Sequence, residues 1–272
     1  MNPETLQKEL RAQAALFVRS ARTAFTYRPA LLLSMLTVTI TSTVPLLVWR
    51  HVYSVRTEPM AVPASQLFPY LVLAACLNFA FFLGVESRVG QRIRMGLIAT
   101  DLLKPVDFQL MQLTQALADL LLNLTVALPF IGLAFSLWGR AALPASPAAF
   151  AAFLLSAGLA FLIQFATSFI FVQSAFFTLS NYGVFFARNA LQLTFAGISA
   201  PLALFPPSLR TVAEYLPFCH SIHTPVSVYL GSLTGPAVWH ALALQSAWAF
   251  GMLVTGRALL HFSLLHLDVQ GG

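Results

Sequence analysis

Long uncharged apolar stretches, separated by short clusters of charged residues, dominate the chain. A stretch of about 20 apolar residues is what an α-helix needs to cross the hydrocarbon core of a bilayer. The charged residues that bound these stretches therefore predict an all-α fold with six membrane-spanning helices. The predicted spans are residues 29–49, 67–85, 110–138, 148–179, 184–205 and 237–262.

The predicted fourth span, 148–179, is too long for one untilted helix across a bilayer. We therefore expect a break within it or an extension into the cytoplasm. A seven-span alternative would split the uncharged gap between Arg140 and Arg188. That alternative would move Arg188 and Arg257 to the side of the membrane with few basic residues, so six spans are favoured.

The composition supports a membrane protein, because 58% of the residues are hydrophobic, 9% are charged and the mean hydropathy is +0.78. Soluble domains carry about 25% charged residues. As first interpretations, this excludes a soluble enzyme, a nucleic-acid-binding protein, a disordered protein and a secreted disulfide scaffold. The chain is predicted to be an integral, multi-pass membrane protein that contacts membrane lipid and no nucleic acid.

The basic residues are distributed unevenly between the two sides of the six-span arrangement. Of the 15 lysines and arginines, one side holds only Arg50, Arg56, Arg140 and Arg210. Basic residues concentrate on the cytoplasmic side of membrane proteins. Both termini are therefore predicted to be cytoplasmic.

Residues 1–27 show a helical pattern of their own. Apolar residues recur at every third or fourth position, and basic residues fall on the opposite side of the helix. This pattern favours an amphipathic helix in the cytoplasmic headgroup layer. The alternative is a soluble helix that packs on this protein or on a partner. Because the segment has no cleavable apolar core, we expect no removable signal peptide.

The sequence contains no recognisable catalytic motif and no phosphate-binding loop, so a non-catalytic chain without a cofactor of its own is predicted. His220 and His223, with Cys219 beside them, form the closest pair of candidate metal ligands. Since no carboxylate stands in a supporting position, a hydrogen-bonded loop is favoured over a metal site.

Polar residues within the predicted spans are few. Asp119 is expected near the cytoplasmic interface, where it would pair with a basic residue of the loop before its span. The neutral polar residues can either bond neighbouring helices, which is favoured, or line a path through the membrane. They are Asn78, Asn123, Gln164, Gln173, Gln192 and Gln245.

The loop 86–109, between the second and third spans, combines charge with an apolar pattern. Its apolar residues are Ile93, Leu97, Ile98, Leu102 and Leu103. We expect a short helix with an apolar and a basic side, ended by Pro105, that docks into a groove on a cytosolic partner. The alternative is a helix on the membrane surface that only supplies positive charge.

The same loop carries a resemblance to a known family. Its residues Arg94-Met-Gly96-Leu-Ile-Ala-Thr-Asp101-Leu-Leu-Lys104-Pro105-Val-Asp107-Phe-Gln109 resemble those of the type-2 ABC transporter permeases. The resemblance is to the bacterial subgroup in which a six-span permease and its ATPase are separate chains. Further similar motifs follow in order: Pro201–Arg210, Leu216-Pro217-Phe218, Thr224-Pro225-Val, Tyr229-Leu-Gly231 and Val269–Gly272. One departure is Gly197-Ile-Ser-Ala, which lacks the paired glycines expected before Pro201.

The resemblance implies that loop 86–109 is the coupling helix, which sits in a groove of a cytosolic ABC ATPase. ATP and Mg²⁺ would then be bound by the ATPase and not by this chain. Residues 1–27 would correspond to the family's connecting helix, and residues 206–218 to the short re-entrant helices before the last span. The implied ATPase-coupling residues are Arg88, Arg92, Arg94, Gly96, Asp101, Lys104 and Pro105.

The resemblance further implies a second permease in a bacterial plasma (inner) membrane, with a related but different chain favoured over a second copy. The second and fifth spans would face this partner, which makes Asn78, Gln192 and Phe195 candidates to line the path. The expected function is the permease subunit of an ATP-driven exporter of lipid, peptide, polysaccharide or drug. A secondary, ion-coupled carrier, which would need inverted repeats, and a membrane scaffold without an ATPase are the alternatives.

Overall fold

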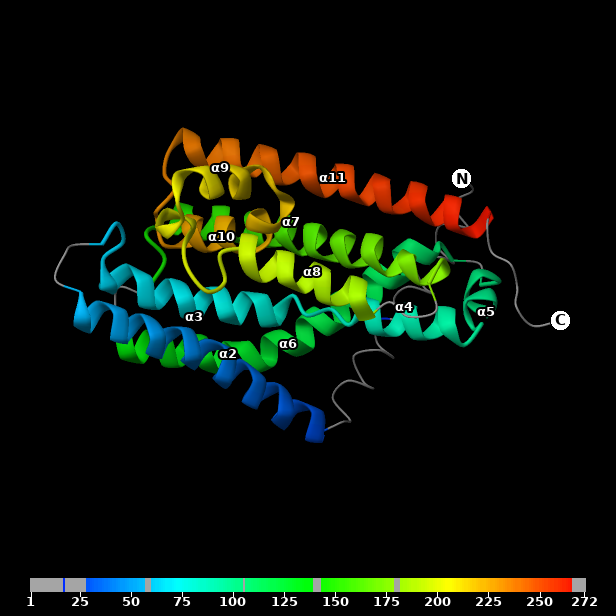
Figure 1. The fold of residues 1–272 in the computed structure, drawn as a ribbon, viewed down its shortest axis with the longest axis horizontal. Coiled ribbons are helices and arrows are strands. Elements are labelled where there is room, and N and C mark those ends of the chain that lie inside the picture. Colours follow the sequence, from blue (N-terminus) through cyan, green and yellow to red (C-terminus); the bar gives the residue numbers. More distant parts are fainter. Residues whose placement is uncertain are drawn as a thin grey trace.

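The computed structural model describes residue 17 and residues 28–56, 60–104, 106–138, 143–178 and 182–265 of the 272-residue chain. All regular secondary structure in these ranges is helical, which confirms the all-α prediction for them. The long helices lie roughly side by side along the longest axis of the molecule (Figure 1).

The helices fall into a long and a short class. The long ones are α2 (Arg28–Val55), α3 (Ala64–Ala80), α6 (Phe108–Trp138), α7 (Pro147–Val172) and α11 (Pro236–Leu265). The short ones are α4 (Val85–Arg94), α5 (Ile98–Leu102), η2 (Gln173–Phe176), α8 (Tyr182–Phe195), η3 (Leu202–Leu204), α9 (Pro207–Tyr215) and α10 (Pro217–Tyr229).

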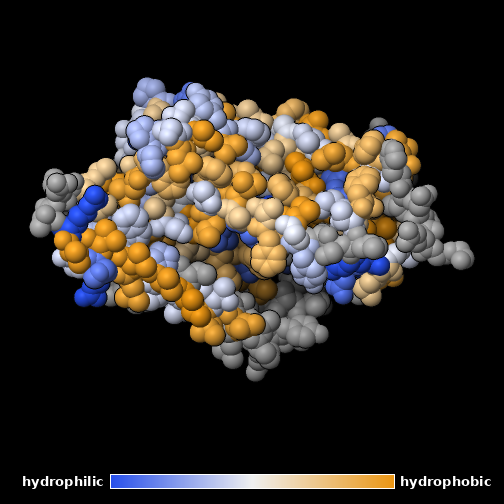
Figure 2. All heavy atoms as spheres, viewed as in Figure 1, coloured by the Kyte–Doolittle hydropathy of each residue, from blue (hydrophilic) through white to orange (hydrophobic). Residues whose placement is uncertain are grey.

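Four helical segments of the described chain are long and apolar enough to cross a membrane. They are Ala64–Arg94, Phe108–Pro129, Pro147–Phe176 and Pro236–Leu265. In Figure 2, hydrophobic residues cover much of the visible face, most clearly along α2, and hydrophilic residues gather mainly toward the two ends. The chain is therefore a multi-pass membrane protein, as predicted, while the count of six spans stays a prediction.

Helix α7 forms the centre of the packing and contacts α4, α8, α10 and α11. Its Phe165 and Phe169 are fully buried, as are Leu67 on α3 and Ile222 on α10. The helix begins with Pro147 in its first turn, and the Ser146 side chain accepts a hydrogen bond from the amide of residue 149. The elements that carry candidate functional residues are thus arranged around a rigid apolar helix.

The prediction of a fifth span over residues 184–205 is wrong in its second half. Helix α8 ends at Phe195, and the chain then turns at Gly197, whose φ is +74°. A Cβ atom at this position would lie 2.7 Å from Tyr70 Oη and 2.8 Å from Leu202 Cδ1, so only glycine fits the turn. The 14 residues of α8 extend about 21 Å, which is less than the roughly 30 Å of a bilayer's hydrocarbon core.

The region predicted to hold short re-entrant helices, 206–218, is helical but longer than expected. It contains α9 and continues through α10 to Tyr229. Cys219, expected in a loop with His220 and His223, is instead buried in α10. Proline precedes or opens both helices, at Pro206, Pro207 and Pro217, where its missing N–H costs no helical hydrogen bond.

The second span and the loop after it also differ from the prediction. Helix α3 ends at Ala80, and a non-helical segment leads through Gly84, with φ of +57°, into α4. The single helix expected in loop 86–109 is two helices, α4 and α5, joined by a turn at Gly96 with φ of +69°. Within the predicted fourth span, α7 passes into the tighter η2 turn at Gln173, and Pro147–Phe176 forms one candidate membrane-spanning segment, so the expected break or cytoplasmic extension stays a prediction.

Several predictions fall on residues outside the described ranges. They concern the N-terminal helix over 1–27, of which only Phe17 is described, Pro105 in the coupling loop, and the C-terminal Val269–Gly272.

Candidate functional site: the α4–α5 end and its ion pairs

The turn between α4 and α5 is organised around one buried carboxylate. Asp101 on α5 has 2% of its surface exposed. Arg92 on α4 binds it with two donors, Nε to one carboxylate oxygen and Nη2 to the other at 2.8 Å. Lys104 Nζ donates to Asp101 Oδ1 at 2.6 Å. Such a bidentate arginine pair fixes orientation as well as distance, so Asp101 holds α4, α5 and the start of the following segment in one arrangement.

Around this carboxylate, apolar side chains point outward. Leu103 is 85% exposed and Met95 is 60% exposed, and Leu97 and Leu102 are also exposed. We call these four residues, with Arg92, Arg94 and Lys104, the docking surface. It lies at the end of the molecule that holds α5 and the end of α11 at Leu265 (Figure 1). Exposed apolar residues rimmed by charge are typical of a protein contact.

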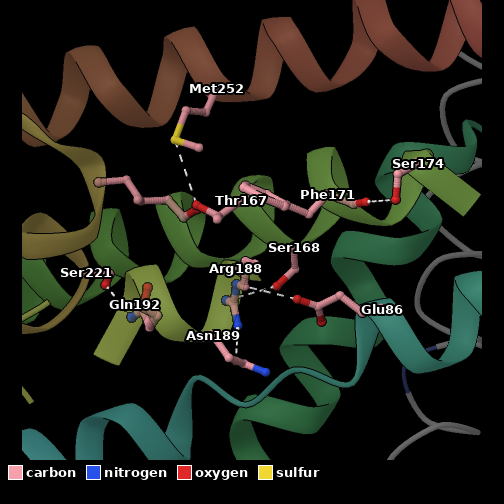
Figure 3. A network of polar contacts seen from close by, with 11 residues as sticks. Glu86, Thr167, Ser168, Phe171, Ser174, Arg188, Asn189, Gln192, Ser221 and Met252 are labelled. Atoms are coloured by element: carbon pink, nitrogen blue, oxygen red, sulfur yellow. Dashed lines mark hydrogen bonds and ion pairs between the residues drawn. The ribbon is translucent and has the colours of Figure 1, made fainter. Parts of the chain in front are cut away.

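A second polar cluster connects the first turn of α4 with α8. Glu86 on α4 and Arg188 on α8 form an ion pair, with 3.6 Å between Oε1 and Nε, and both side chains are buried. Arg188 also donates to Ser168 Oγ on α7 at 3.3 Å and to Asn189 Oδ1 at 3.2 Å (Figure 3). The ion pair joins α4 to α8, and the bond to Ser168 adds α7.

The sequence did not predict a pair between Glu86 and Arg188. Arg188 was assigned to the cytoplasmic side, and the structure places its side chain in the interior, with 4% exposed. The signal that could have found the pair is that Glu86 and Arg188 have opposite charge and lie near the ends of predicted spans on the same, cytoplasmic side. A buried charge without its partner is costly, so this pair marks a position where α4 and α8 must stay together.

The third ion pair joins α4 to α6. Arg88 Nη1 donates to Asp119 Oδ2, and the two side chains are 32% and 26% exposed. The prediction that Asp119 pairs with a basic residue of the preceding loop is confirmed.

Arg94, at the end of α4, lies near α8. Its guanidinium carbon is 5.9 Å from the centre of the Tyr182 ring, within cation–π range.

The residues predicted to line a path are not gathered into one site. Gln192 on α8 is buried and donates to Ser221 Oγ on α10 at 2.9 Å. Asn78 on α3 is half-buried, and Phe195 packs against the cluster that contains Leu202. Neutral polar residues that bond a different segment, as favoured in the sequence analysis, are Asn123, Gln173, Gln192 and Gln245.

The candidate metal ligands are engaged in hydrogen bonds. His220 Nδ1 lies 3.0 Å from Thr224 Oγ1, and His223 Nδ1 lies 2.8 Å from Tyr70 Oη. Among the residues that the structure describes, no cluster of three or more histidine, cysteine or acidic side chains is arranged to hold a metal ion.

Comparison with known proteins adds one match. Residues 63–271 match the sequence model of a family described as ABC-2 family transporter protein. A search of curated proteins found no match. The matched range includes α3, the docking surface and every later helix.

Proposed function

This chain belongs to the ABC-2 family of transporter proteins, and from this premise we propose that it is the permease subunit of an ATP-driven exporter. Members of the family associate with an ATPase subunit. In this proposal the chain provides the membrane path, and cytosolic ABC ATPase chains bind ATP and Mg²⁺ and supply the free energy. The membrane is a bacterial plasma membrane, and both termini are cytoplasmic because the basic residues concentrate on that side.

The observation that carries this proposal is the docking surface. Leu103 and Met95 project outward from a turn that Asp101 fixes from inside. A flexible loop would lose conformational entropy when it binds a partner, whereas a turn already held in one conformation by ion pairs loses little. The buried position of Asp101 makes it a support for the contact, while Arg94, Leu103 and Met95 form the contact itself. Arg92 and Lys104 contribute partly exposed charge at its edge.

The ion pairs of α4 connect the docking surface to the membrane domain, so that movement at the surface can be transmitted. Movement of the ATPase against α5 would shift α4, and α4 is bound to α8 through Glu86 and Arg188 and to α6 through Arg88 and Asp119. Because separating Glu86 from Arg188 would leave two charges unpaired in an apolar interior, α4 and α8 move together. Export would thus couple ATP hydrolysis to movement of α8.

Helix α8 is also the best candidate to face a second permease. Its Tyr182, Phe186 and Leu193 are exposed, whereas α3 is largely enclosed by α2, α6 and α10. In the proposed complex α8 covers part of the membrane thickness, and α9 and α10 return from the opposite side. Gln192 and Phe195 would lie close to the path, with Asn78 behind them, and the second permease would be a related chain or a second copy.

The test compares two substitutions that each place a charged side chain at an exposed apolar position. Leu103→Asp changes the docking surface, and Val55→Asp changes another exposed apolar position, at the end of α2, where Val55 is 68% exposed. Both proteins are co-expressed with a candidate cytosolic ABC ATPase and purified in mild detergent. We expect Leu103→Asp to weaken ATPase recovery about tenfold or more, because an unpaired charge would be buried in the contact. Val55→Asp should recover the ATPase like the unchanged protein.

A second set of measurements separates the stimulation of ATP hydrolysis by the permease from binding of the ATPase. Arg92→Glu with Arg94→Glu should leave membrane insertion intact and abolish the stimulation of ATP hydrolysis by the permease. Normal stimulation in that double variant, or equal ATPase recovery with Leu103→Asp and Val55→Asp, would contradict the proposal. Transport that persists in ATP-depleted vesicles and follows an ion gradient would instead indicate a secondary carrier.

A further inference from the structure

A cavity of about 320 Å³ lies at the end of the molecule opposite the docking surface, beside α9 and α10 (Figure 1). Its volume lies within the range of about 300–1,000 Å³ that is usual for small-molecule sites. Its walls come from the segment before α3, α3 itself, η3, α9, α10 and the turn after α10. Its polar lining residues are Gln66, Tyr70, Arg210, His223, Ser227 and Ser232.

The hydrogen bonds of Tyr70 determine which nitrogen of His223 carries a proton. Tyr70 Oη lies 2.8 Å from the carbonyl oxygen of Gly197 and 2.8 Å from His223 Nδ1. The carbonyl can only accept, so the single hydroxyl hydrogen of Tyr70 points to it. His223 must then donate from Nδ1 to Tyr70, which leaves Nε2 of the neutral ring as an acceptor. Ser227 Oγ is 3.4 Å from Nε2, at the long limit of a hydrogen bond.

Arg210 supplies donors to the same cavity. Its Nε donates to Glu214 Oε1 on the next turn of α9 at 2.7 Å, which uses one of the five N–H groups of the guanidinium. Glu214 also offsets the positive charge of Arg210. No acidic side chain is among the described residues that line the cavity. The lining therefore combines donors with an acceptor and carries little net charge.

We propose that this cavity binds a neutral polyhydroxylated group of the size of one sugar ring. A hydroxyl group both donates and accepts, so it can accept from Arg210 or Gln66 and donate to His223 Nε2. Carboxylate and phosphodiester groups only accept and would face the lone pair of Nε2, and an ammonium group would meet no carboxylate. Pro201, Ala203 and Leu230 form apolar walls against which the C–H face of a sugar ring can pack.

Two sources can supply this chemistry, a free sugar and the headgroup of a glycolipid. The site is additional to the proposed export function, because binding requires neither nucleotide nor ATPase. Loss of the ATPase contact would therefore leave binding at this cavity intact, and failure of binding would leave the docking proposal untouched.

The experiment uses the full chain, with the ATPase that co-purifies, in phosphatidylcholine nanodiscs without nucleotide. Binding of methyl α-D-glucopyranoside is measured by saturation-transfer NMR and titration. Arg210→Met and Gln66→Leu change exposed lining residues, and Ser208→Ala on α9 changes an exposed residue that does not line the cavity. We expect each lining variant to bind about threefold to tenfold more weakly, as the loss of one hydrogen bond predicts, and Ser208→Ala to bind normally.

A second arm adds monoglucosyl diacylglycerol to the nanodiscs. Reduced binding of the soluble glucoside identifies the glycolipid headgroup as an occupant, and unchanged binding identifies the free sugar. The proposal is overturned if the glucoside does not bind the unchanged protein, or if both lining variants bind it normally. It is also overturned if inorganic phosphate binds instead and depends on Arg210.

Discussion

At the end of the molecule that holds α4 and α5, interior polar groups are held by ion pairs, whereas at the end that holds α10 they are held by neutral hydrogen bonds. The first end contains the pairs Glu86–Arg188, Arg88–Asp119 and Arg92–Asp101. The second contains the bonds from Tyr70 to Gly197, from Gln192 to Ser221 and from Gln245 to the carbonyl oxygen of His220. The charged pair on α9, Arg210–Glu214, lies on the surface.

The difference fits the role proposed for each end. A loop that binds a soluble ATPase, as we propose for the docking surface, needs charge, and a charge that reaches into the membrane domain needs a partner close by. At the other end, α10 packs against α3 and α7, and α9 packs on α10 and η3. Neutral hydrogen bonds there satisfy backbone groups without buried charge. In the proposed complex, charge at one end serves contact between chains, and neutral bonds at the other end shape a cavity.

The largest expected effect comes from breaking the buried ion pair. Arg188→Ala leaves Glu86 buried without its partner, which should lower the free energy of unfolding by about 3–5 kcal/mol. Thermal unfolding in detergent, followed by tryptophan fluorescence, measures the loss. Arg257→Ala is the matched control, because Arg257 is 65% exposed and pairs with Asp107 at 2.5 Å near the surface. Equal losses in the two variants would show that burial does not distinguish the pairs.

Exchanging the charges of Glu86 and Arg188 tests more directly whether the two residues pair. Glu86→Arg combined with Arg188→Glu should regain part of the stability that Arg188→Ala loses. A direct interaction between the two residues makes the effects of their substitutions non-additive. If the exchange lowered the free energy of unfolding by more than the sum of the two single substitutions, direct pairing would be contradicted.

An intermediate effect is expected at the turn of the neutral end. Gly197→Ala would place a Cβ atom 2.7 Å from Tyr70 Oη and force alanine into a φ of +74°. Strain of this kind costs about 1–3 kcal/mol, and displacement of Tyr70 would also alter the cavity. Gly251→Ala on α11 is the control, because no atom lies within 4 Å of a Cβ there. The control should unfold at the same or a higher temperature, since alanine favours helix over glycine.

The smallest effect is expected for the exposed pair on α9. Glu214→Gln removes the partner of Arg210, and both side chains are about half exposed, at 48% and 51%. The change in unfolding free energy should stay below about 1 kcal/mol. A loss comparable to that of Arg188→Ala would mean that another chain covers α9 in the assembled transporter. Comparing the unfolding of the complex with that of the separated chain would show whether the loss depends on assembly.

Much of the architecture could be predicted from the positions of charged residues. Gaps without charge locate the long helices, and Pro147 and Pro236 open α7 and α11 where the apolar stretches begin. The pairing of Asp119 with a loop arginine followed from the cost of an isolated carboxylate near a membrane. The end of α8 did not follow, although Gly197 and Pro201 mark a possible turn, because an apolar stretch has the same pattern whether its helix continues or folds back.

The candidate site was predicted in outline and corrected in detail. Arg88, Arg92, Arg94 and Lys104 were named as coupling residues through the family resemblance, and that role stays a prediction. The inward position of Asp101 could not be predicted, because it depends on the turn at Gly96, which closes α5 onto α4. Leu103 was named among the apolar residues of the loop, but its exposed position could not be predicted, because a leucine in an apolar loop gives no indication of whether it faces the protein or the solvent.

The sequence by itself determined that this chain is helical, membrane-embedded and charged at the loop between its second and third long helices, because these properties depend on local composition and spacing. Only the tertiary structure decided that Glu86 meets Arg188, that Tyr70 meets Gly197 and His223, and that a cavity forms beside α10. These contacts join residues that are distant along the chain. Their geometry depends on how α7 packs against its neighbours, and local patterns carry no information about that packing.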